Sequence, residues 1–271
     1  ERTQITGDDA YRFRHLLIRD AAYEALPKAA RAELHERFAD WLAEHGDLFE
    51  LDEIVGYHLE QAARHLRDLD RADARADELS RRAAERLGTA GAAAFQREDH
   101  HAARNLLGRA VALLPAGEPR RRLIPDLVDA LLLGSDPDGV DDLLDELAAG
   151  DLRDQATADV LRALRDIRFG LGRPFHELEA DALAAHATLE AAGDEMGVAR
   201  AERVLAQVTW GLCRTGESHR YCLSLHERLR RLGSTAYQSE IVPAIQIGAV
   251  FAGRPASEVK QLMDELYGEA R

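Results

Sequence analysis

Apolar residues recur at helical spacing along almost the whole of this 271-residue chain. Between residues 29 and 45, for example, Leu34, Phe38, Trp41 and Leu42 occupy positions i, i+4, i+7 and i+8, which lie on one face of an α-helix. Beyond the first dozen residues, no long alternating run of Val, Ile and Thr indicates a β-sheet. The pattern therefore predicts an all-α fold.

Glycine and proline divide this pattern into separate helices, because glycine commonly ends a helix and proline commonly begins one. A short extended piece around residues 11–14 is expected before the first helix. The expected helices are 15–26, 29–45, 51–66, 72–96, 99–114, 119–133, 137–148, 152–169, 174–192, 194–214, 217–232, 235–252 and 255–268. Helices of these lengths with short connections pack as successive antiparallel hairpins, and hairpins in series form a superhelical array.

One hairpin carries a more specific pattern of small residues. In residues 84–115, Gly91, Ala103 and Ala110 precede Pro115. This spacing resembles a tetratricopeptide repeat, in which small residues let two antiparallel helices approach closely and the final proline turns the chain into the next hairpin. Later hairpins keep only parts of the pattern, so we expect a tetratricopeptide-like array of irregular repeats over residues 27–271.

Stacked hairpins of this kind form a continuous concave surface suited to a partner helix or an extended peptide. The first helix of the hairpin at 84–115 would line that groove. Its candidate partner contacts are Glu85, Ala92, Phe95 and Gln96, although Phe95 is equally suited to packing between hairpins. A small molecule held inside the superhelix is the alternative occupant.

The charge of the chain argues against nucleic acid as a direct partner. Asp and Glu number 49 against 35 Lys and Arg, which gives a net charge of −14. Sequence-independent affinity for nucleic acid depends on cationic side chains that displace counterions. The arginine-rich runs at 120–122 and 228–231 are interpreted as solvated helix faces or as caps of helix carbonyl ends.

The same composition bears on the compartment of the protein. No apolar run approaches the ~20 residues that a membrane-spanning helix needs, and residues 1–4 do not begin a signal peptide. We therefore expect a cytoplasmic protein without a membrane partner. Its start without methionine suggests a piece of a longer protein, and an oligomer is compatible with the sequence.

The residues that could carry chemistry form no convincing constellation. His100 and His101 are adjacent, so their side chains diverge on a helix, and a solvated helix start is expected there. His58 and His65 lie seven residues apart, which is too far for a His-x-x-x-His metal site, so packing or a surface role is expected. Cys213 and Cys222 are expected to be reduced, buried thiols.

Catalytic motifs are missing as well. The sequence contains no Gly-x-x-x-x-Gly-Lys-Ser/Thr phosphate loop and no Gly-x-Ser-x-Gly elbow. The paired acids Asp141-Asp142 and Asp145-Glu146 follow a helical surface pattern. We therefore expect a chain that is not itself an enzyme and holds no cofactor or metal.

Two stretches near the start carry a resemblance to a known family. "YRFRHLLIRDAAYEALPKAARAELHERFADWLAEHG" at 11–46 and "DEIVGYHLEQAARHL" at 52–66 resemble the junction in bacterial signal-transduction ATPases of the STAND type. These multidomain regulators place an ATPase core and a winged-helix domain before a tetratricopeptide-like array. Many actinobacterial members also carry a class III adenylate or guanylate cyclase domain, and relatives carry a helix-turn-helix domain.

The resemblance implies a role for one histidine. Residues 1–26 would be the end of the winged-helix domain and the linker to an ATPase upstream. His15 there resembles the histidine of the Met-His-Asp motif, which contacts the β-phosphate of ADP in related ATPases, although Arg14 and Leu16 replace the methionine and the aspartate. His15 is therefore a candidate nucleotide sensor in a full-length protein, and a capping or packing residue in this chain alone.

The resemblance and the helical pattern together favour a regulatory function. We expect a non-catalytic module that receives a signal from a protein or peptide partner and transmits it to the ATPase domain of its own chain. ATP or ADP would belong to that upstream domain. The alternative is a sensor of a small molecule bound inside the superhelix.

Overall fold

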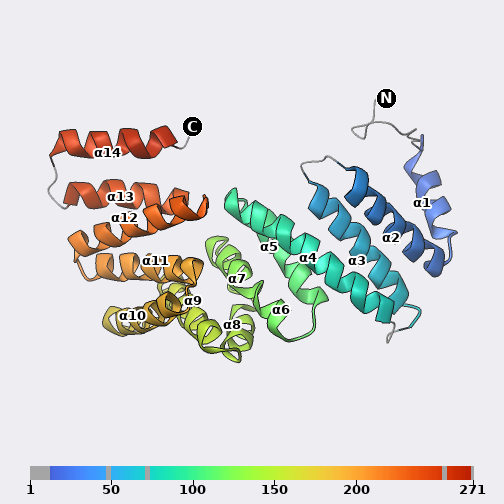
Figure 1. Cartoon of the computed structure of the whole chain (residues 1–271), viewed down its shortest axis with the longest axis horizontal. Helices are drawn as coiled ribbons and strands as arrows, with labels where there is room; N and C mark the ends of the chain where they lie inside the picture. The colour runs from blue at the N-terminus through green and yellow to red at the C-terminus, as the bar shows by residue number, and fades with distance from the viewer. Residues whose placement is uncertain (1–12, 47–49, 71–73, 252–254, 270–271) are drawn as a thin grey trace. The chain divides into compact units, whose positions relative to one another are not determined.

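The computed structural model describes residues 13–46, 50–70, 74–251 and 255–269, and all regular secondary structure within these ranges is helical. The predicted all-α fold is confirmed (Figure 1). In chain order the helices are α1 Leu16–Glu24, α2 Lys28–His45, α3 Leu51–Arg67, α4 Ala74–Gln96, α5 His100–Leu113, α6 Glu118–Arg121, α7 Ile124–Leu133, α8 Val140–Ala148, α9 Leu152–Phe169, α10 Phe175–Ala191, α11 Glu195–Gly211, α12 Thr215–Leu232, α13 Gln238–Phe251 and α14 Ala256–Glu269.

The prediction of one continuous helix over residues 119–133 is wrong. The stretch 119–133 forms two helices, α6 and α7, which are separated by a turn at residues 122–123. Pro125 lies in the first turn of α7, where its missing N–H costs no helical hydrogen bond, so the proline begins a new helix. Arg120 of α6 donates to the carbonyl oxygens of Val111 and Leu114, and this arginine therefore caps the end of α5.

The extended piece expected at 11–14 lies partly outside the described residues. Phe13 and Arg14, its described part, precede α1 without forming a strand. His15 is the N-terminal cap residue of α1, with an extended backbone, and its carbonyl oxygen accepts from the N–H groups of Ile18 and Arg19.

The chain divides into two compact units. Unit 1 comprises the residues up to Ala93 and Ala102–Leu123, and unit 2 comprises Ala94–His101 and the residues from Ile124 onward. The ends of α4 and α5 that meet at the turn between them therefore belong to unit 2. The boundary expected between residues 26 and 27 stays a prediction.

In unit 1, close packing between helices depends on glycine. A Cβ atom on Gly56 of α3 would lie 2.8 Å from Cγ of Leu87 in α4. A Cβ atom on Gly91 of α4 would lie 2.7 Å from Cγ of Leu107 in α5. Such distances are shorter than carbon atoms tolerate, so these helices approach where a side chain is missing. Gly91 is the small residue expected to permit this approach.

In unit 2, each helix from α8 to α14 packs against the next one in the chain. Alternate helices also meet, since α9 contacts both α7 and α11. Figure 1 shows α10 to α13 side by side, with the chain reversing direction at each connection. This arrangement brings side chains of α7, α11 and α13 into one interior.

Candidate functional site

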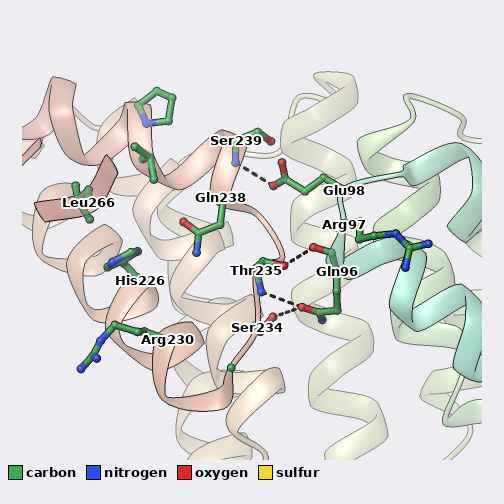
Figure 2. Close-up of a pocket in the computed structure, with 13 residues that line it drawn as sticks. Gln96, Arg97, Glu98, His226, Arg230, Ser234, Thr235, Gln238, Ser239 and Leu266 are labelled. Atoms are coloured by element: carbon green, nitrogen blue, oxygen red, sulfur yellow. Dashed lines mark hydrogen bonds between the residues drawn. The ribbon is translucent and has the colours of Figure 1, made fainter. Parts of the chain in front are cut away.

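A pocket of about 680 Å³ lies within unit 2 (Figure 2). It is lined by the turn between α4 and α5, by α12 and α13 with their connecting loop, and by α14. Arg97, His226 and Arg230 contribute basic groups to its lining, while Val242, Pro243 and Leu266 contribute apolar surface. A volume of this size with both kinds of lining is typical of sites for small organic molecules.

One edge of the pocket is formed by hydrogen bonds between segments far apart in the sequence. The side-chain oxygen of Gln96 accepts from the hydroxyl of Ser234 at 2.8 Å and from the N–H of Thr235 at 2.9 Å. Oε1 of Glu98 accepts from the N–H of Ser239 at 2.9 Å. Figure 2 shows these bonds joining the end of α4 and the turn after it to the α12–α13 loop and the first turn of α13. We call these five residues the clasp.

The backbone is strained on both sides of the clasp. Glu98 has a φ of 58° and Tyr237 a φ of 64°, in the left-handed region that favours glycine. Glu98 ends α4 with the turn that glycine usually makes, since Asp99 donates to the carbonyl oxygen of Ala94. Strain of this kind costs of order 1–3 kcal/mol and persists only where surrounding contacts hold it.

Tyr237, which lies in the α12–α13 loop between Thr235 and Ser239, reaches into the interior of unit 2. Its ring packs edge-on against Phe95 with centroids 5.6 Å apart. Its hydroxyl donates to Oδ2 of Asp129 at 2.6 Å, and the guanidinium of Arg203 lies 4.5 Å from its ring centroid. Burial, followed by the charge of Asp129, raises the pKa of Tyr237 well above its ordinary value, so the phenol stays protonated.

Asp129 belongs to a buried group of ion pairs that joins α7, α11 and α13. Arg200 contacts Asp129 at 2.6 Å and Asp126 at 2.5 Å. Arg203 contacts Asp129 at 3.3 Å and Glu240 at 2.6 Å. Burial by itself opposes the charge of Arg200, yet the charges of Asp129 and Asp126 outweigh it and hold the pKa of Arg200 well above its ordinary value.

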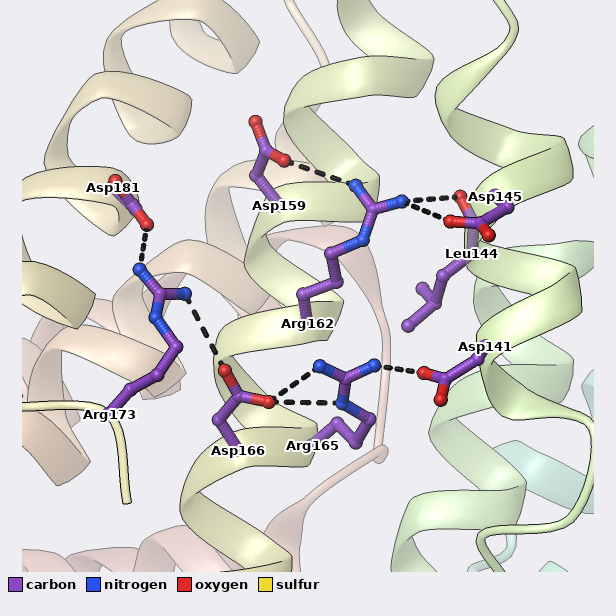
Figure 3. A network of polar contacts seen from close by, with 9 residues as sticks. All are labelled: Asp141, Leu144, Asp145, Asp159, Arg162, Arg165, Asp166, Arg173 and Asp181. Carbon is purple, nitrogen blue, oxygen red and sulfur yellow. Dashed lines mark hydrogen bonds and ion pairs between the residues drawn. The ribbon is translucent and has the colours of Figure 1, made fainter. Parts of the chain in front are cut away.

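A second set of ion pairs joins α8, α9 and the start of α10 (Figure 3). Arg162 contacts Asp145 at 2.8 Å, and Arg165 contacts both Asp141 and the buried Asp166. Asp141 and Asp145 are thus exposed acids of α8, as expected, but each also pairs with an arginine of α9. Because Asp141 and Asp145 lie at the surface, their two pairs stabilise the fold only weakly, whereas Asp166 is buried beside its arginine.

In unit 1, three histidines and a tyrosine come together. The hydroxyl of Tyr23 in α1 lies 2.9 Å from Nε2 of His35 in α2 and 2.9 Å from Nε2 of His65 in α3. Nδ1 of His35 lies 2.7 Å from Nδ1 of His58 in α3. His58 and His65 thus pack, as expected, but they share His35 as a neighbour, which the spacing within α3 could not indicate.

The residues expected to contact a partner occupy different environments. Glu85 is exposed and Ala92 is half-buried on α4, and both belong to unit 1. Phe95 is 2% exposed and packs against Tyr237, which corresponds to the packing alternative for this position. Gln96 lines the pocket as part of the clasp. Their contact with a partner stays a prediction.

The other candidate residues are also placed by the structure. His15 is exposed, and its side chain makes no capping hydrogen bond to α1. His100 begins α5 with its ring near that of Phe95, and His101 is exposed. Cys222 is buried, as expected. The prediction that Cys213 is buried was wrong, because this residue lies exposed in the turn after α11, with a φ of 59°.

Neither a metal site nor a membrane span is found in the part of the chain that the structure describes. No three His, Cys, Asp or Glu side chains of those residues are arranged to hold a metal ion. No helix among them combines the length and the apolar surface needed to cross a bilayer. The sequence matches no family model and no curated protein.

Proposed function

We propose that this chain is a non-catalytic regulatory module that receives a signal from a protein or peptide and transmits it to an ATPase domain that precedes it in the same polypeptide. In this proposal the helices form a tetratricopeptide-like superhelix, and residues 1–26 are the end of a winged-helix domain. The protein acts in the cytoplasm, and nucleic acid or membrane is not its direct partner.

The observation that carries the proposal is the exposed apolar surface around α1. Phe13, Leu16, Leu17 and Ile18 are all exposed, and Leu17 has 82% of its surface accessible. Exposure of four neighbouring apolar side chains to water is unfavourable. Such patches commonly mark contacts with another protein surface. A preceding domain that covers α1 would remove this surface from water and would sense the position of α1.

The test uses a full-length protein that includes the upstream ATPase. Leu17→Glu should change the rate of ATP hydrolysis, because a charge on the covered face would weaken the contact between α1 and the ATPase. Leu69→Glu is a matched control, since Leu69 is exposed at the end of α3. His15→Ala should change the retention of ADP. Unchanged hydrolysis in Leu17→Glu and unchanged ADP retention in His15→Ala would contradict the proposal.

The pocket of unit 2 favours a second candidate, the sensing of a small molecule. Arg97, His226 and the apolar wall suit a small organic acid with an apolar portion, while Arg230 already pairs with Glu227 and the carboxylate of Glu98 accepts from Ser239. A ligand that bridges the clasp would stabilise one arrangement of the α12–α13 loop, and it could act as a signal only by binding two arrangements unequally.

Thermal-shift screening distinguishes the two candidates. Organic acids that raise the melting temperature would support small-molecule sensing. Val242→Trp should abolish that rise by filling the pocket, whereas Ile247→Trp should preserve it, because Ile247 is exposed on the same helix. A chain that no organic acid stabilises, but that co-purifies with a protein, would support the first candidate.

A further inference from the structure

The hydrogen atoms in the contacts among Tyr23, His35, His58 and His65 can be assigned one by one. The three contacts run in the order His58, His35, Tyr23, His65. With neutral imidazoles each contact contains one hydrogen atom. In one arrangement His58 donates to His35, His35 donates to Tyr23, and Tyr23 donates to His65. Reversing every donor gives an equally complete arrangement.

Additional protons disturb this arrangement. The contact between His35 and His58 joins two Nδ1 atoms at 2.7 Å, a distance at which one nitrogen donates and the other accepts. If both imidazoles were protonated, both nitrogens would carry hydrogen, and two positive charges would face each other. This pair therefore tolerates at most one additional proton while it keeps its geometry.

The surrounding charges also disfavour protonation. On α2, Arg31 lies over the ring of Tyr23 and Lys28 pairs with Asp68, which follows α3. On α3, Arg64 lies near His65. Among these groups Asp68 alone favours a charged His65, while the three cations oppose it.

The pKa values follow from burial and from these neighbours. Burial, followed by the charges of His58 and His65, lowers the pKa of His35 to about 4. Burial lowers the pKa of His58. Burial, followed by the charge of Arg31, lowers the pKa of His65. On α3, Tyr57 also contacts His35 through its ring.

Helix α1 depends on this group for its position. No residue of α1 is buried. Its described hydrogen bonds with α2 and α3 are those of the Tyr23 hydroxyl and a 2.8 Å bond from Arg31 to the carbonyl oxygen of Glu24, and the Arg31 guanidinium also lies over the Tyr23 ring. Because little apolar surface is buried under α1, loss of the Tyr23 contacts removes much of what holds it.

We propose that Tyr23, His35, His58 and His65 form an acid-sensitive latch that holds α1 against α2 and α3 and releases it when the histidines bind protons. The latch residues belong to unit 1, whereas the residues of the pocket belong to unit 2. It would control how α1 presents the apolar side chains of Phe13, Leu16, Leu17 and Ile18.

The direction of the pH dependence follows from the lowered pKa values. Above the ordinary histidine pKa of about 6.5 the imidazoles are neutral in both forms, so acidity does not affect the latch. As the pH falls below about 6.5 towards 4, the released form binds protons more readily than the latched form does. Release is therefore favoured. For His35 alone, this linkage shifts the equilibrium by at most about 30-fold between pH 8 and pH 5, the value reached when release restores the ordinary pKa in full.

Hydrogen–deuterium exchange of the 271-residue chain tests the latch. Exchange is measured by mass spectrometry from pH 7.5 to pH 5, with labelling times corrected for the intrinsic rate at each pH. We expect the protection of the α1 amides to fall at least tenfold over this range, while the amides of α3 keep theirs. Equal protection of α1 at both pH values, or loss of α3 together with α1, would overturn the proposal.

Two variants separate the latch from general acid sensitivity. Tyr23→Phe removes the hydroxyl, so its α1 amides should exchange rapidly at every pH. Tyr57→Phe is the matched control, because Tyr57 lies beside the same histidines without a described hydrogen bond from its hydroxyl, and it should behave as the wild type. Wild-type protection in Tyr23→Phe would also overturn the proposal. If that variant lost its α3 protection, the pH series of the wild type would decide alone.

Discussion

The hydroxyl of Tyr237 donates a 2.6 Å hydrogen bond to Oδ2 of Asp129, although 108 residues separate the two in sequence. The tyrosine is 1% exposed and the aspartate 0%. The same carboxylate also accepts from Arg200 and Arg203. The contact therefore holds the α12–α13 loop, and with it one half of the clasp, against the interior of unit 2.

Removal of the Tyr237 hydroxyl should destabilise the protein. Tyr237→Phe keeps the ring contacts but deprives a buried carboxylate of one donor, so we expect a loss of about 1–3 kcal/mol in the free energy of unfolding. Urea unfolding followed by circular dichroism measures it. Tyr57→Phe, at an exposed position, should change stability by less than about 0.5 kcal/mol. Equal values for the two variants would contradict the assigned role of the contact.

Arg200→Met should have a larger effect. The substitution leaves the buried Asp129 and the half-buried Asp126 without their closest cation, and breaking a buried pair costs about 3–5 kcal/mol. Combining it with Asp129→Asn should cost less than the sum of the two single changes, because both remove the same contact. Arg81→Met, which breaks an exposed pair with Glu78, should leave the denaturation midpoint unchanged. Additive costs in the double variant would show that the pair is not coupled.

Replacing each of two glycines on neighbouring helices by alanine should change the stability of the protein in opposite directions. Gly91→Ala would place Cβ 2.7 Å from Cγ of Leu107 and 3.1 Å from its backbone nitrogen, so α4 and α5 must separate, at a cost of about 1–3 kcal/mol. Gly108→Ala on α5 meets no atom within 4 Å and should stabilise the protein by up to about 1 kcal/mol through helix propensity. Thermal unfolding of both variants measures the difference. A stabilising Gly91→Ala would show that the helices are not closely packed there.

The two cysteines should differ in reactivity. Burial raises the pKa of the Cys222 thiol to about 11, so very little thiolate is present at pH 8, and Cys213 is exposed. Iodoacetamide at pH 8 should label Cys213 at least tenfold faster, as measured by mass spectrometry of the peptides. Denaturation in urea should make the two rates similar. Comparable labelling of both thiols in the folded protein would be inconsistent with a buried Cys222.

Most helix boundaries could be predicted because their signals are local. The expected helices at 51–66 and 152–169 correspond to α3 at Leu51–Arg67 and α9 at Leu152–Phe169. Apolar spacing, glycine and proline act on neighbouring residues, and these are visible in a single sequence. The break between α6 and α7 had such a signal in Pro125, a residue that prefers the first turn of a helix.

The candidate sites were largely invisible to the same reasoning. Gln96 was a candidate groove residue, yet its partner Ser234 lies 138 residues further along the chain. His35 carried no motif, although it lies between Tyr23 and His58 in the folded unit 1. Both groups depend on the angle and the register at which helices pack. Those follow from the whole set of apolar contacts, and a local pattern does not specify them.

The sequence by itself thus determined which segments are helical, since backbone propensity, apolar period and turn residues are properties of short stretches. Only the tertiary structure decided which polar side chains meet. A buried charge such as Asp129 is stable where partners from distant helices surround it, and the burial of apolar surface over the whole unit decides which helices those are.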